Sequence, residues 1–387
     1  MKPDTALVHA GRHPTQQGGA VNPPVYQTST VLFPDLATLE AAHRPGPRKM
    51  VYGRRGTPTS WALADAITDL EHGHDTVLAP SGLAAVTTSL LSVLGSGDHV
   101  LMVDTVYGPT RTFCDGLLAR LGVVTTYYDP LIGAGIADLI RPETRAIYLE
   151  SPGSLTFEVQ DLPAIVAVAR DRGITTLIDN TWAAGHFLKP LDLGVDIVVH
   201  ACTKYIVGHS DAMMGSITAN AASWPKVYSA HGDLGQFAGA GDMYLAQRGI
   251  RTMAVRLARH QETGLRLAHW FADRPEVTRV LHPGLPGDPG HALWQRDFTG
   301  ASGLFGVLLK PVGHAALAAF LDDLQWFGMG YSWGGFESLV IPAHPERGRT
   351  AVPWAEAGTL LRFHAGLEDP DDLITDLEAG FARMAAL

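Results

Sequence analysis

The chain has 387 residues, of which 46% are hydrophobic and 18% charged, with a formal net charge of −10. This length exceeds one ordinary hydrophobic core, so we expect a globular protein of two domains. The acidic balance argues against a non-specific nucleic-acid or membrane surface, since both need basic patches.

The cysteines and the N-terminal sequence bear on the compartment. The two cysteines, Cys114 and Cys202, provide neither a disulfide framework nor a zinc site, which favours a reducing cytoplasm. The sequence MKPDTALVHAGRHP lacks the apolar core of a signal peptide, and no run of about 18 apolar residues occurs. We therefore predict a cytoplasmic protein with no membrane span and no bound metal.

Residues 1–55 are rich in proline, glycine, threonine and serine and show no helical periodicity. They predict an extended N-terminal arm. Because such an arm buries little surface by itself, we expect it to contact a neighbouring subunit.

Residues 56–249 alternate between helical and strand-like patterns. Short apolar runs predict strands at 76–79, 99–104, 123–129, 145–151, 175–180 and 196–201. Helical spacing predicts helices at 59–73, 81–94 and 161–173. This alternation indicates an α/β domain with a mostly parallel sheet covered by helices on both faces.

Residues 250–387 follow a different pattern and predict a smaller C-terminal α+β domain. One long helical stretch over 242–273 leads into it. Strand-like runs at 302–310, 339–343 and 360–367 follow, with helices at 313–324 and at the C-terminus.

Asp179 and Lys204 each follow an apolar strand, where open α/β sheets place their ligands. Alone, Asp179 predicts a turn cap and Lys204 a solvated surface lysine. Together they also suit a pyridoxal cofactor, with the lysine forming a Schiff base and the carboxylate pairing with the protonated pyridine nitrogen.

Two further stretches suit a phosphate group. Ser81, Gly82 and Leu83 lie where a strand turns into a helix, whose first N–H groups bind anions. Tyr52 and Arg54 lie in a loop flanked by glycines, suited to bidentate phosphate contacts. A plain serine cap and an exposed basic turn are the alternative interpretations.

Three other positions suit a cofactor ring or a substrate. Tyr107 follows another strand and can stack on a ring. Arg362 lies within an apolar strand and therefore needs an anion, either an internal acid or a substrate carboxylate. Ser332 and Trp333 precede two glycines, as in a tight turn that lines a pocket. Structural roles remain open for each of them.

The motifs YGRRGTPT, SGLAA, DTVYGPT, LESPGS, IDNTWAAG, TKYIVGHSD, YSWGGFESL and LRFHAGLED occur between residues 52 and 369. In this order they resemble the Cys/Met-metabolism family of pyridoxal-phosphate enzymes. The resemblance implies the aminotransferase-like fold of type I and pyridoxal 5′-phosphate as the cofactor. Trp333 and Ser154 make the chain most similar to the cystathionine β-lyase branch, because γ-lyase and γ-synthase relatives usually carry smaller or different residues there.

The resemblance implies roles for the candidate residues. Lys204 is similar to the Schiff-base lysine, Asp179 to the pyridine partner and Tyr107 to the stacking ring. The family's phosphate-binding cradle is matched by Ser81, Gly82, Leu83 and Thr203. Tyr52 and Arg54 are similar to residues that reach the phosphate of the neighbouring subunit. Arg362, Ser332, Trp333 and Tyr52 resemble the substrate-binding group. Ala201 departs from the family, because many relatives carry a phosphate-binding serine there.

The implied activity is β-elimination of a thiol from an L-amino acid thioether, as in methionine biosynthesis by transsulfuration. The family also implies a homotetramer, a dimer of dimers with shared active sites. Two alternatives stay open: a γ-synthase, sulfhydrylase or γ-lyase of the same family, and a non-enzymatic binding role.

Overall fold

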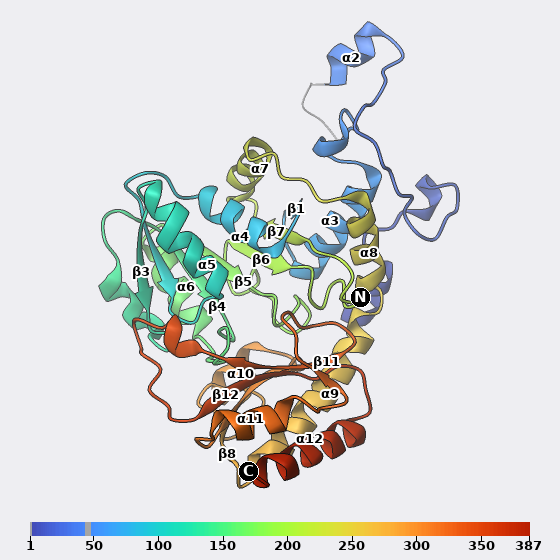
Figure 1. Ribbon diagram of the computed structural model, residues 1–387. Helices are drawn as coiled ribbons and strands as arrows, with labels where there is room; N and C mark the ends of the chain where they lie inside the picture. Colours follow the sequence, from blue (N-terminus) through green and yellow to red (C-terminus); the bar gives the residue numbers. More distant parts are fainter. Residues whose placement is uncertain (1, 43–47) are drawn as a thin grey trace.

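The computed structural model describes residues 2–42 and 48–387 and contains two β-sheets (Figure 1). The larger sheet has the strand order β1-β7-β6-β5-β4-β2-β3. Its strands are β1 (Asp75–Ala79), β2 (His99–Val103), β3 (Val124–Tyr128), β4 (Thr144–Glu150), β5 (Thr175–Asp179), β6 (Ile197–Ala201) and β7 (Gly215–Ala219).

This sheet confirms the predicted α/β class. The pairings from β6 to β3 are parallel, whereas β7 runs antiparallel to both β6 and β1. The prediction missed β7, because the short run GSITA consists mostly of small and polar residues. Every residue of β7 is nevertheless buried, so its position in the sheet outweighs its weak local signal.

Three of the helices around the larger sheet begin at residues whose side chains cap them. The Ser81 hydroxyl accepts the Ala84 N–H at 3.0 Å and starts α4, and Thr57 with Ser60 forms a capping box at the start of α3. The helices around this sheet are α3 (Pro58–Glu71), α4 (Gly82–Leu91), α5 (Gly108–Phe113), α6 (Leu162–Asp171), α7 (Trp224–Asp233) and α8 (Ala240–Ile250).

The second sheet lies below the first in Figure 1 and has the strand order β10-β11-β12-β9-β8. Its strands are β8 (Val277–Leu281), β9 (Leu304–Leu309), β10 (Phe327–Gly328), β11 (Ser338–Ala343) and β12 (Thr359–His364). Four helices accompany it: α9 (Met253–Ala272), α10 (His291–Asp297), α11 (His314–Leu321) and α12 (Pro370–Ala385). The long helix predicted over 242–273 is divided, because α8 ends at Ile250 and α9 starts at Met253.

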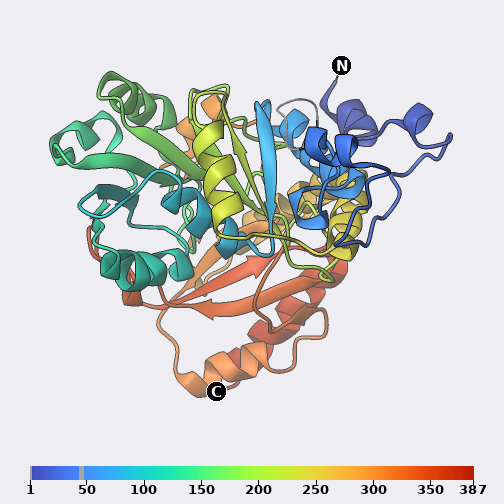
Figure 2. The ribbon, with the colours of Figure 1, turned by 90° about the horizontal axis from the view of Figure 1, so that it is seen from above.

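The described residues of the N-terminal segment include the short α-helices α1 (Pro3–His9) and α2 (Leu36–Ala42). The expectation of a segment without helices is therefore wrong for these residues. Leu7 of α1 is buried against the larger core, whereas α2 buries none of its side chains. Seen from above, the segment lies at one side of the molecule (Figure 2). Its exposed part predicts a contact with another surface.

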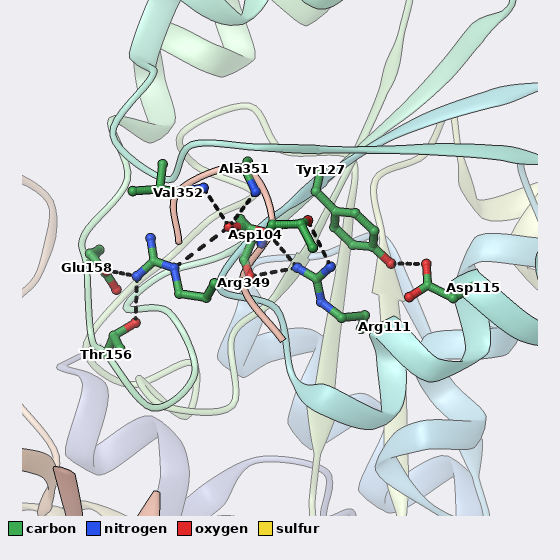
Figure 3. Close-up of polar contacts among 10 residues, drawn as sticks. Asp104, Arg111, Asp115, Tyr127, Thr156, Glu158, Arg349, Ala351 and Val352 are labelled. Atoms are coloured by element: carbon green, nitrogen blue, oxygen red, sulfur yellow. Dashed lines mark hydrogen bonds and ion pairs between the residues drawn. The ribbon is translucent and has the colours of Figure 1, made fainter. Parts of the chain in front are cut away.

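Asp104 directly follows β2 and joins the larger sheet to segment 350–352 of the C-terminal region (Figure 3). Its buried carboxylate accepts the Thr350 N–H at 2.9 Å and the N–H groups of the next two residues at 3.0 Å. Arg111 donates to the same carboxylate at 2.6 Å. Burial alone would raise the pKa of Asp104, but these donors outweigh it and the pKa is lowered.

We expect Asp104→Asn to lower the free energy of unfolding at pH 7 by about 3 kcal/mol, because it leaves buried donors facing a neutral amide. The folded-state pKa of Asp104 is lowered, so its contribution is present above the ordinary aspartate pKa and lost as pH falls through the folded pKa. Urea unfolding at pH 7 and pH 3 measures the difference. Asp323→Asn, at an exposed position, serves as the control. A gap between variant and parent that is equally large at both pH values contradicts this account.

Candidate active site

Three neighbouring strands of the larger sheet end at one edge and define the candidate site. The parallel register pairs Glu150, the last residue of β4, with Asp179, the last residue of β5. The adjacent strand β6 ends at Ala201, and Lys204 follows in the turn after it. Carboxyl ends of parallel strands are where such sheets bind ligands, so the topology brings Asp179 and Lys204 to one place.

The amine of Lys204 contacts a loop of the C-terminal region. Its Nζ donates to Ser332 Oγ at 2.5 Å and lies 5.3 Å from the centre of the Trp333 ring. Burial, followed by the positive charge of Arg362, lowers the pKa of Lys204 to about 8, although Asp179 opposes the change. A lysine with this pKa is partly neutral near pH 7 and can act as a nucleophile or a base.

Glu150 is a residue of the site that the sequence analysis missed. It accepts the Tyr107 N–H at 2.8 Å and lies beside Asp179 in the register. Burial, followed by the charge of Asp179, raises the pKa of Glu150 well above its ordinary value. The pKa of Asp179 is also raised, mainly by burial. The signal that identified Asp179, a carboxylate at the end of an apolar strand, would also have identified Glu150.

The start of α4 lies against the end of β6. A side-chain carbon added to Gly82 would stand 2.6 Å from Ala201 Cβ, so only glycine allows this approach. The first N–H groups of α4, those of Gly82 and Leu83 among them, have no partner within the helix. Thr203 lies in the same turn after β6 as Lys204, and its hydroxyl donates to Met214 O at 3.2 Å and accepts the Met214 N–H at 3.1 Å. The cradle therefore rests on the N–H groups at the start of α4, which suit an anion.

Arg362 and Ser332 form the other wall of the site. Arg362 Nη2 donates to the Ser332 carbonyl at 2.9 Å, and burial lowers the pKa of its guanidinium to about 10, which keeps it charged at pH 7. Ser332 has a φ of +84°, a left-handed backbone conformation that residues other than glycine rarely adopt. The loop therefore presents the Ser332 hydroxyl to Lys204 and its carbonyl to Arg362.

Tyr107 is 46% exposed, so part of this residue is accessible. Burial of the rest, followed by the charges of Asp179 and Glu150, raises the pKa of its hydroxyl. The structure thus places Tyr107 beside the acid pair, at the site.

Tyr52 and Arg54 lie elsewhere. They line a cavity of about 670 Å³ together with Trp224, Tyr228 and His231, and Arg54 donates to Gly232 O at 3.2 Å. In the described part of the chain, no hydrogen bond joins either residue to Lys204, Asp179, Tyr107 or Arg362. Within one chain the structure therefore does not bring them to the site.

Cys202 is buried, and burial raises the pKa of its thiol to about 12, so it is an inert core residue. Residues 2–42 and 48–387 hold no group of three potential metal ligands from histidine, cysteine, aspartate and glutamate. No helix among these residues is both long and apolar enough to span a bilayer.

The side chains and N–H groups of the site match the charged groups of pyridoxal phosphate. The acid pair suits a protonated ring nitrogen, the start of α4 suits a phosphate, and the amine of Lys204 suits an aldehyde. Tyr107 offers a partly exposed aromatic side chain, which can stack on a ring. The residues fit this group, and the site is of the class found in α/β enzymes that use pyridoxal phosphate.

Comparison with known proteins gives the family. The model of the Cys/Met metabolism PLP-dependent enzymes matches residues 4–382. The chain is 47% identical to cystathionine beta-lyase MetC of Escherichia coli (strain K12), over 99% of both chains. It is 39% identical to an L-alanine/L-glutamate racemase of Wolbachia pipientis wMel, over 100% of this chain and 98% of that one.

A solved structure agrees with these relatives. The cystathionine gamma synthase of Xanthomonas oryzae pv. oryzae in complex with cystathionine has a TM-score of 0.90 and 32% identity, covering 100% of this chain and 99% of that one. The chain belongs to the Cys/Met metabolism PLP-dependent enzymes, which confirms the resemblance and pyridoxal phosphate as the cofactor.

We expect cofactor-free enzyme to react with pyridoxal phosphate at a rate that rises with pH through a midpoint near pH 8 and levels above it, because the pKa of Lys204 is about 8 and only its neutral amine attacks an aldehyde. Stopped-flow absorbance measures this rate. Arg362→Gln removes the neighbouring positive charge and is expected to shift the midpoint to higher pH. A parent midpoint near pH 10, the value of an ordinary lysine, contradicts the lowered pKa.

We expect Ala201→Ser to tighten the binding of pyridoxal phosphate about tenfold, because a hydroxyl at this position lies beside the start of α4 and adds a donor to a charged group. Titration of cofactor-free enzyme measures the apparent Kd. Ala201→Gly, which adds no hydroxyl, is the control. Equal affinities of the parent and Ala201→Ser would show that the cradle needs no further donor.

Proposed function

We propose that the protein is a cystathionine β-lyase, which cleaves L-cystathionine or a related cysteine S-conjugate to a thiol, pyruvate and ammonia. With cystathionine the thiol is homocysteine, a precursor of methionine. The observation that carries the proposal is the position of Trp333, whose ring lies 5.3 Å from Lys204 Nζ. The 47% identity to a cystathionine beta-lyase, against 32% to a gamma synthase, favours the same reaction.

Arg362 orients the substrate in this proposal. Its charged guanidinium lies in the wall opposite the sheet and suits the α-carboxylate. Ser332 lies between Arg362 and Lys204 and contacts both. A substrate held by its carboxylate therefore has its α-carbon near the lysine amine.

Lys204 moves the protons. Bound pyridoxal phosphate supplies an electron sink for the charge that develops at the α-carbon, and Asp179 keeps its ring nitrogen protonated. The neutral amine of Lys204 removes the α-proton and becomes an ammonium group. The bond between the β-carbon and sulfur then breaks with its electron pair on sulfur, and Lys204, assisted by Tyr107, returns a proton to form the thiol. Addition of water to the remaining three-carbon unit yields pyruvate and ammonium.

Trp333 favours β- over γ-elimination. γ-Elimination requires a second proton removal at the β-carbon, and the base must move to reach it. The Lys204 amine is hydrogen-bonded to Ser332 and lies beside the Trp333 ring, so its movement toward the ring is restricted.

Neighbouring subunits complete the proposed enzyme. Residues 56–249 bind the cofactor, residues 250–387 supply Arg362, Ser332 and Trp333, and residues 1–55 contact another subunit. The exposed apolar side chains of this arm, Val21, Val25, Tyr26, Leu32, Leu36 and Leu39, support an interface. Tyr52 and Arg54, which lie apart from Lys204 in their own chain, then serve the neighbour's phosphate in a cytoplasmic homotetramer.

Product analysis tests the function. We expect L-cystathionine to give pyruvate and homocysteine in equal amounts, with kcat reduced at least about 1000-fold in Lys204→Ala. Chromatography of the thiols and of derivatised 2-oxo acids measures both. 2-Oxobutyrate with cysteine would show γ-elimination instead and refute the proposal.

The racemase relative suggests a second arm of the same experiment. Racemisation and β-elimination both begin with removal of the α-proton, but L-alanine carries no leaving group. A kcat/KM for D-alanine formation above that for pyruvate formation would assign the chain to racemisation. We expect the reverse order.

A further inference from the structure

His364, the last residue of β12, holds the loop that carries Ser332 and Trp333. The Gly334 N–H donates to His364 Nε2 at 3.0 Å. The other ring nitrogen, Nδ1, lies 3.1 Å from the Glu337 carbonyl, which can only accept a hydrogen bond. Nδ1 therefore carries the ring proton, and Nε2 is an unprotonated acceptor. His364 spans both ends of the short segment 334–337.

The surroundings keep His364 neutral. Its side chain is 1% exposed, and burial lowers its pKa well below the ordinary histidine value. The positive charges of Arg362 and Lys204 and the ring of His260, centred 5.1 Å away, act in the same direction. A protonated Nε2 would lose its capacity to accept the Gly334 N–H.

Gly334 transmits this position to Lys204. It has a φ of +85°, and a side-chain carbon added to it would lie 3.0 Å from the Lys204 carbonyl carbon. The loop backbone thus rests on the backbone of the lysine. The Trp333 ring packs 5.4 Å from Tyr205, which in turn lies 6.0 Å from His364. A displacement of Gly334 therefore moves Trp333 and Ser332 relative to the Lys204 amine.

We propose that His364 is a positioning residue: by accepting the Gly334 N–H it sets the distance of Ser332 and Trp333 from Lys204. The inference rests on the proposed function for its kinetic consequence, but not for its structural one. His364 touches neither the amine nor a substrate in this account and acts only through the loop.

Two substitutions separate the two ring nitrogens. Glutamine can place an amide oxygen where Nε2 accepts, whereas asparagine retains only a donor near Nδ1. We expect His364→Asn to lower kcat/KM for L-cystathionine at least about tenfold, and His364→Gln to retain it within about threefold. The holoenzymes are compared with the parent, with circular dichroism confirming that each is folded.

The emission of Trp333 gives a readout independent of activity. It is obtained by subtracting, from the fluorescence of each variant, that of the same variant carrying Trp333→Phe in addition. We expect a red shift, meaning greater contact with water, in His364→Asn but not in His364→Gln. Unchanged Trp333 emission in His364→Asn, or equal kinetics of the two variants, overturns the proposal. If the parent forms no pyruvate, the proposed function fails, while the emission still tests His364.

Two further variants serve as a control and as a replacement for His364→Asn. His282 is also buried in the C-terminal region and accepts the Gly284 N–H through Nδ1 at 2.9 Å. His282→Asn is expected to lower the Tm without changing kcat/KM or the Trp333 emission, and a red shift there overturns the specific role of His364. If His364→Asn does not fold, Gly334→Ala is used instead, because its added methyl group would press on the Lys204 backbone and move the Gly334 N–H away from His364. Unchanged Trp333 emission in that variant refutes the proposal.

Discussion

The site depends on one constraint, a lysine amine withdrawn from water beside an arginine. An ammonium group there is disfavoured by desolvation and by repulsion from Arg362, which leaves Lys204 able to lose its proton near neutral pH. Burial also raises the pKa values of Asp179 and Glu150, which end the neighbouring strands of the sheet. Burial at this site therefore brings the pKa values of the two acids and of the lysine closer together, as proton transfer requires.

This constraint requires both parts of the chain. The larger sheet supplies Lys204 and the acid pair, while the loop between β10 and β11 and strand β12 supply the opposing wall. Polar contacts hold the two parts together near the site: Asp104 holds segment 350–352, and Ser210 donates to the Glu337 carboxylate at 2.7 Å. Glu337 follows Ser332 in the same loop, and the Ser332 hydroxyl accepts from the Lys204 amine.

The sequence predicted the larger sheet well where strands are continuously apolar and end in a polar residue, as at Asp179. The prediction failed where the position of a segment in the fold determines its secondary structure. Strand β7 consists of small residues, and residues 251–252, where the helix breaks after α8, include neither proline nor glycine. Individual candidate residues were found by residue type at strand ends, but the contact of Lys204 with Ser332 joins residues 128 positions apart. No local pattern indicates such a pairing. Glu150 carries the same strand-end signal as Asp179, whereas the role of His364 depends on a contact with Gly334, 30 positions away in the chain.

The backbone of Ser332 has a consequence for engineering. A serine held at a φ of +84° destabilises the folded chain by about 1–3 kcal/mol relative to a relaxed residue. Glycine at this position would relieve that cost, so a screen for thermostable variants would select it. The same change deletes the hydroxyl bonded to Lys204. Heat resistance and turnover are therefore opposed at this residue, and stabilising libraries for this enzyme are best designed with position 332 held fixed.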